Sequence, residues 1–74
     1  MRSRRLLIMG PSDEPMWVRL YVQVVGYRWA AMILAATTAP PAPGELKGTA
    51  FFADTAAEAE RLALEYLGEG VSQN

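Results

Sequence analysis

The sequence predicts an α+β domain in which a three-stranded antiparallel sheet packs against one C-terminal helix (β-β-β-α). Two patterns predict this fold class. Residues 17–25 alternate aliphatic side chains at even positions with aromatic or polar side chains at odd positions, which is typical of a strand that separates a core face from an outer face. Residues 56–67 instead repeat their apolar side chains at helical spacing.

The length of 74 residues allows one domain, which we place at residues 16–68. Residues 1–15 are expected to form a flexible N-terminal segment, and residues 69–74 a C-terminal tail. The apolar run before Gly10 is too short for a secretion signal or a membrane span. With no cysteine and no targeting segment, the sequence is typical of a cytoplasmic bacterial or phage protein, and we expect no membrane association.

Gly26 and Tyr27 fit a two-residue type II′ turn, because glycine stands at the first central position. The turn predicts a second strand over residues 28–37 and fixes its register against the first strand. In that register the core face carries Val18, Leu20, Val22, Val24, Trp29, Ala31, Ile33 and Ala35. The outer face carries Trp17, Arg19, Tyr21, Gln23, Arg28, Ala30, Met32 and Leu34.

Residues 38–46 contain three prolines, which exclude a helix or a central strand and predict an extended connection. Residues 47–53 are expected to form a shorter third strand, with one of its two phenylalanines pointing inward. Thr55 and Glu58 then form a capping box that begins the helix, and Gly68 is the expected stop. The predicted inward face of the helix holds Ala56, Ala59, Leu62, Ala63, Tyr66 and Leu67. Leu64 falls on the polar side, which Glu58, Arg61 and Glu65 line as ion pairs.

The sequence gives little support to an enzyme or to a metal or cofactor site. It contains no histidine and no cysteine, which removes the commonest general base and the commonest zinc ligands. Its serines have no histidine partner, and its carboxylate pairs fall in a loop or on a solvated helix face. The glycines form no phosphate-binding loop. We therefore predict a non-enzymatic protein without a cofactor.

The outer sheet face is the candidate binding surface, because it combines aromatic, apolar and basic side chains. The residues are Trp17, Arg19, Tyr21, Gln23, Arg28, Met32 and Leu34. The first interpretation is contact with protein, through a homodimer or with a protein partner. The second is single-stranded nucleic acid bound by the aromatic and arginine side chains. The third is coverage of this face by the chain's own N-terminal residues. Arg2, Arg4 and Arg5 are interpreted as a solvated terminus, with a DNA-binding arm as the alternative.

The segment that leads into the helix resembles HicB-like antitoxin domains. In that family a Gly-Asp-Thr-x-x-Glu-Ala segment begins the helix after the third strand. Asp54, Thr55, Glu58 and Ala59 match this segment, while Ala53 replaces the glycine. The resemblance implies a partial ribonuclease-H-like sheet without catalytic acids, which binds a toxin partner or itself. The family's separate DNA-binding segment and its acidic residues at the sheet edge are missing from this sequence.

Overall fold

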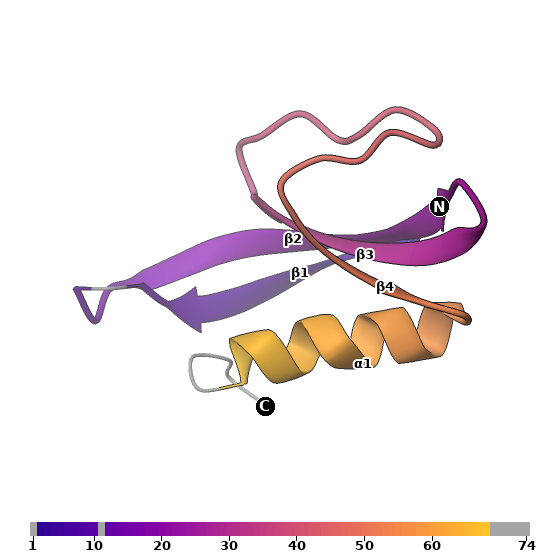
Figure 1. Cartoon of the computed structure of the whole chain (residues 1–74). Helices are drawn as coiled ribbons and strands as arrows, with labels where there is room; N and C mark the ends of the chain where they lie inside the picture. The colour runs from indigo at the N-terminus through magenta and orange to yellow at the C-terminus, as the bar shows by residue number, and fades with distance from the viewer. Residues whose placement is uncertain (1, 11, 69–74) are drawn as a thin grey trace.

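The computed structural model describes residues 2–10 and 12–68 and contains an antiparallel sheet with one helix (Figure 1). The α+β class and the C-terminal helix are confirmed, but the sheet has four strands rather than three. Each strand pairs with its neighbours in sequence, in the order β1-β2-β3-β4. The elements are β1 (Arg2–Met9), β2 (Pro15–Val25), β3 (Arg28–Ala35), β4 (Thr49–Ala53) and α1 (Ala56–Leu67).

Strand β1 comes from the segment that the sequence analysis placed outside the domain. It pairs with β2 along its whole length, from Arg2 opposite Val22 to Met9 opposite Pro15. Strand β1 was not predicted because residues 6–9 are all apolar and do not alternate with polar residues. As an edge strand, β1 needs only partial burial. Leu6 packs against the core, and the N-terminal half of β1 is exposed. The predicted tail, residues 69–74, lies outside the described residues.

The predicted hairpin between β2 and β3 is confirmed in its register. Val25 lies opposite Arg28, Val22 opposite Ala31, and the pairing continues to Val18 opposite Ala35. Gly26 has a φ of 66° and Tyr27 is not in the left-handed region, as a type II′ turn requires. Because parity fixes the face of every side chain, the two predicted faces of this hairpin are the faces of the actual sheet.

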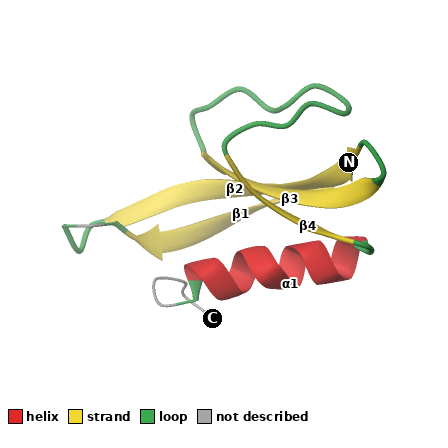
Figure 2. Cartoon of the chain, in the orientation of Figure 1, coloured by secondary structure: helices red, strands yellow, loops and turns green. Residues whose placement is uncertain are grey.

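Helix α1 covers one face of the sheet, mainly over β3 and β4 (Figure 2). The core on this side contains Leu20, Val22, Ala31, Ala53, Ala59 and Ala63. Ala59 and Ala63 of α1 are fully buried, so their small side chains let the helix approach the strands closely. Two predicted core residues at the ends of the hairpin, Val24 and Ala35, are instead exposed.

The helix begins as predicted, but its buried face is rotated from the predicted one. The Thr55 hydroxyl accepts a hydrogen bond from the Glu58 amide at 3.1 Å, which is the first half of the capping box. Leu64, predicted on the polar side, packs against the core, whereas Tyr66 is 64 % exposed. Glu60 is half-buried on α1 and pairs with Arg2 and Arg4 of β1.

Candidate functional site

The outer sheet face, on the side opposite α1, is covered by residues 36–48, which we call the proline loop. This loop arches over the sheet between β3 and β4 (Figures 1 and 2). Beneath it lies a second buried cluster of Tyr21, Ala30, Met32 and Leu34. All four were predicted on the outer face, and three of them, Tyr21, Met32 and Leu34, were placed in the candidate site. The covering segment is the proline loop, and not the N-terminal residues considered in the third interpretation.

Gln23 holds the proline loop onto this face. Its side chain is buried, with 6 % of its surface exposed. Its amide nitrogen donates to the carbonyl oxygens of Ala42 and Glu45 at 3.1 and 3.2 Å, and its oxygen accepts from the Gly44 amide at 3.4 Å. A residue that we placed in a binding surface is therefore a buried structural residue. The loop also contributes a buried side chain of its own, that of Pro41.

The remaining predicted site residues are separated from one another. Trp17 is 47 % exposed, and the Arg5 guanidinium lies 4.7 Å from the centre of its ring. Arg19 is half-buried on β2 and lies opposite Arg5 of β1. Arg28 lies at the other end of the hairpin and pairs with Asp54 at 3.5 Å. The structure therefore does not bring the seven predicted residues together as one accessible surface.

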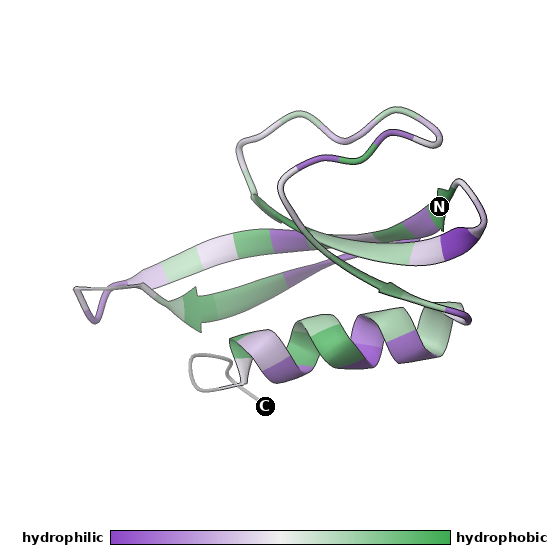
Figure 3. Cartoon of the chain, in the orientation of Figure 1, coloured by the Kyte–Doolittle hydropathy of each residue, from purple (hydrophilic) through white to green (hydrophobic). Residues whose placement is uncertain are grey.

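An accessible apolar surface lies instead along the free edge of β4. Phe51 and Tyr66 pack with their ring centres 5.2 Å apart, and Phe52 is 37 % exposed on the other face of the strand. Leu62 is half-buried and lies one helical turn before Tyr66, on the same side of α1 as Tyr66. We call Phe51, Phe52, Leu62 and Tyr66 the β4 edge surface. Figure 3 shows the hydrophobic colour along most of β4.

The β4 edge surface was not predicted from the sequence, for an identifiable reason. Tyr66 was predicted on the inward face of the helix, and the strand over residues 47–53 was not assigned to an edge of the sheet. The signal was present in the two adjacent phenylalanines of a short, uncharged strand, which must point to opposite faces of the sheet. Only the sheet order shows that this strand lies at an edge, where both side chains meet solvent.

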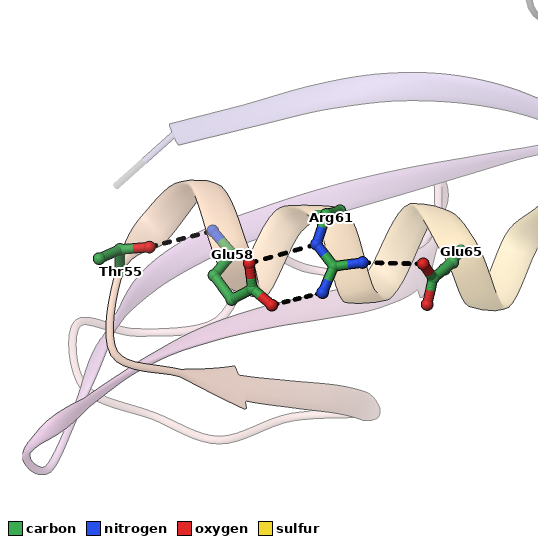
Figure 4. Close-up of polar contacts among 4 residues, drawn as sticks. All are labelled: Thr55, Glu58, Arg61 and Glu65. Carbon is green, nitrogen blue, oxygen red and sulfur yellow. Dashed lines mark hydrogen bonds and ion pairs between the residues drawn. The ribbon is translucent and has the colours of Figure 1, made fainter.

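The solvent face of α1 carries the predicted ion pairs (Figure 4). Arg61 lies between two carboxylates: its Nε donates to Glu58 at 3.2 Å and its Nη1 to Glu65 at 2.8 Å. The hydrogen bond from Arg61 lowers the pKa of the Glu58 carboxyl, and the same bond raises the pKa of Arg61. All three groups are solvated, so they stabilise the helix surface and do not form an acid–base pair for catalysis.

The described residues contain no group of three acidic side chains close enough to hold a metal ion. Across residues 2–10 and 12–68, no helix is long and apolar enough to cross a membrane. Arg2 and Arg4, interpreted as part of a solvated terminus, pair with Glu60 at 2.9 and 3.1 Å.

Comparison of the chain with protein-family models, with curated proteins and with solved structures gives no match. The resemblance to HicB-like antitoxin domains therefore stays a prediction. The matched residues Thr55 and Glu58 do take part in the start of α1, which any well-capped helix requires.

Proposed function

We propose that this chain is a small non-enzymatic binding module that forms a homodimer through the β4 edge surface. One observation carries the proposal: β4 is a short, uncharged and apolar edge strand that leaves its outer backbone groups unpaired within the described residues. Proteins usually protect such an edge with charge, proline or a covering segment, because it is a template for strand pairing. Here an aromatic side chain lies on each side of it instead.

The hairpin register indicates which backbone groups of β4 face outward. A two-residue turn is closed by a hydrogen-bonded pair, here Val25 and Arg28, and bonded pairs alternate along an antiparallel ladder. The alternation assigns the bonds between β3 and β4 to the pairs that contain Thr49, Phe51 and Ala53. The amide and carbonyl groups of Ala50 and Phe52 therefore point to the free edge.

A twofold axis at Phe51 satisfies all of these outward groups. It places Ala50 of one copy opposite Phe52 of the other, which gives two bonded pairs and four hydrogen bonds. The two Phe51 side chains then meet on the helix face, next to Leu62 and Tyr66 of each copy. Because an axis perpendicular to the sheet keeps both helices on the same side, the result is a continuous eight-stranded sheet.

The opposite edge of the sheet is a poor place for self-association. Strand β1 carries Arg2, Arg4 and Arg5, so pairing it with a second β1 would bring like charges together. At β4 the flanking charges are opposite, because Lys47 precedes the strand and Asp54 follows it. Antiparallel pairing brings Lys47 of one copy toward Asp54 of the other.

We assign this module a regulatory or adaptor role toward a protein partner in the cytoplasm. The absence of cysteine and histidine supports a cytoplasmic, non-catalytic protein. A chain of this size buries only about 60 % of the surface of its unfolded form, so association is a source of stability that it lacks as a monomer. The HicB-like resemblance supports the same role, since that family binds a partner or itself.

The experiment is a measurement of mass in solution over a concentration series. We expect the native chain to shift from monomer to dimer as concentration rises. Tyr66→Lys and Phe52→Lys should each raise the dimer dissociation constant at least tenfold, because a charge would be placed in an apolar contact. Tyr27→Lys is the matched control, since Tyr27 is fully exposed at the β2–β3 turn and outside this surface. A native chain that stays monomeric, or edge variants that dimerise as well as the control, would contradict the proposal.

A further inference from the structure

The outer face carries a second accessible surface, at the end of the sheet that the proline loop does not cover. It contains Arg5, Trp17 and Arg19, from the adjacent strands β1 and β2. Arg5 lies directly opposite Arg19, and Trp17 lies next to them with nearly half of its surface exposed. We call these three residues the Arg-Trp patch.

The two arginines of this patch differ from the others in the chain. Within residues 2–10 and 12–68, neither Arg5 nor Arg19 pairs with a carboxylate, and each of the other arginines does. The pairs join Arg2 and Arg4 to Glu60, Arg28 to Asp54, and Arg61 to Glu58 and Glu65. Two cations without a described counter-charge have therefore been placed side by side.

The pairing type brings the two charges close together. Counted from the β2–β3 turn, Arg5 and Arg19 form a non-hydrogen-bonded pair, in which the Cα atoms lie about 4.5 Å apart and the side chains are closest. Like charges in such a pair destabilise a sheet. The two like charges do not stabilise each other, whereas a bound anion would be held by both guanidinium groups.

Trp17, the third residue of the patch, indicates which kind of anion would bind. The Arg5 guanidinium already stacks on the Trp17 ring at 4.7 Å, which forms a planar platform beside the two charges. The same alternation leaves the Arg5 amide pointing out of the β1 edge, as a further donor to an anion. A ligand that combines phosphate groups with flat rings uses every part of this surface.

We infer that the Arg-Trp patch binds single-stranded nucleic acid, with a phosphate between Arg5 and Arg19 and a base stacked on Trp17. Stacking on an aromatic side chain is independent of base identity, so binding has little sequence preference. An acidic peptide would satisfy the two charges but would leave the indole unused. This inference is independent of the proposed dimer, because the patch lies at the far side of the sheet from β4.

The test is titration of a fluorescently labelled ten-nucleotide oligothymidine, followed by anisotropy over a series of salt concentrations. Arg5→Gln and Arg19→Gln should each weaken binding about tenfold and make its salt dependence shallower, since each removes about one phosphate contact. Trp17→Ala should weaken binding without changing the salt dependence. Arg28→Gln is the matched control, because Arg28 is an exposed arginine on the same face but is paired with Asp54.

Each outcome decides between the ligands. Weakened binding in the three patch variants, with the control unchanged, supports the inference. Three results would overturn it: no binding of the oligonucleotide, equal binding of a poly-glutamate peptide, or an equal loss in Arg28→Gln. Circular dichroism of each variant shows whether it folds. Arg5, Trp17 and Arg28 are exposed and Arg19 is half-buried, so none of these substitutions changes a fully buried side chain.

Discussion

At the scale of single residues, Gln23 shows how a polar side chain becomes structural. Its alternation with aliphatic neighbours places it on the outer face, as the sequence predicts. No local pattern indicates that three backbone groups of the proline loop will bind it, since those groups lie 19 to 22 residues away. A buried amide with both ends satisfied fixes the position of the loop more specifically than an apolar residue would.

We predict that Gln23→Leu costs about 2 kcal/mol of unfolding free energy, because the two carbonyls and one amide of the loop lose their partner. Gln23→Glu should cost more at neutral pH, since a carboxylate would face the carbonyl oxygens of Ala42 and Glu45. Urea unfolding at pH 7 measures both. Variants as stable as the native chain would show that the loop does not depend on this residue.

A pH prediction follows from Glu58. Because its pKa is lower in the folded chain than in the unfolded chain, its ion pair stabilises the fold above about pH 4, where the unfolded carboxyl is ionised. That contribution is lost as the pH falls through the lower, folded pKa. Between pH 7 and pH 3 the thermal stability of Glu58→Gln should therefore fall less than that of the native chain, as measured by thermal unfolding.

The matched control is Glu14→Gln, which removes an exposed carboxylate that has no ion pair among the described residues. This variant should keep the native pH profile. Since both members of the Glu58–Arg61 pair are solvated, the difference should shrink as salt is raised. Equal pH profiles for the two variants at low salt would contradict the assignment.

At the scale of elements, the hairpin and the start of the helix could be predicted because their signals are local. Gly26 fixes the turn and its register, and Thr55 caps the helix. The cover of the outer face could not be predicted, since it depends on contacts between distant segments. Strand β1 was missed although it pairs with its neighbour in sequence, because residues 6–9 show no alternation. The predicted buried face of α1 was wrong at Tyr66 and Leu64, because helical spacing alone does not show how the helix packs against β3 and β4.

The close packing of the proline loop on β3 gives an element-scale prediction. At Gly48, where φ is 69°, an added Cβ would lie 2.4 Å from Cδ2 of Leu34 and 3.1 Å from the carbonyl oxygen of Ile33. Gly26 has a similar φ of 66° but open space around it. Gly26→Ala should therefore lower the unfolding free energy only by the strain of an alanine at positive φ, about 1 kcal/mol. Gly48→Ala should cost about 1–3 kcal/mol more.

Chemical denaturation of the two glycine variants measures this difference directly. The shared positive φ cancels in the comparison, so the difference reports the contact between the loop and Leu34. Equal losses of stability in the two variants would mean that the loop yields freely and does not seal the outer face. Such a loop would leave Tyr21 and Met32 accessible, as the sequence analysis expected.

At the scale of the whole molecule, the chain covers both faces of its own sheet. The helix covers one face and the proline loop covers much of the other, with the sheet between them (Figure 1). The candidate site predicted from sequence was wrong as a single surface, because four of its seven residues lie beneath the loop. What stays accessible lies toward the edges: the β4 edge surface and the Arg-Trp patch.

The two proposed surfaces are compatible in one assembly. Pairing at β4 would place the two Arg-Trp patches on the same face of an eight-stranded sheet, separated by about six strand spacings or roughly 29 Å. A single strand that reaches both patches would bind more tightly than one that reaches only one, through effective concentration alone. Variants at Tyr66 that disrupt the dimer would then weaken the binding of long oligonucleotides more than that of short ones.

The central claim is that β4 pairs with β4 of a second copy, and amide hydrogen exchange followed by nuclear magnetic resonance tests it most directly. The outward amides of Ala50 and Phe52 should exchange at least tenfold more slowly at a concentration where the dimer is populated than in the dilute monomer. The outward amides of Ser3, Arg5 and Leu7 at the β1 edge should exchange equally at both concentrations. Protection at β1 instead of β4, or at neither edge, would contradict the account.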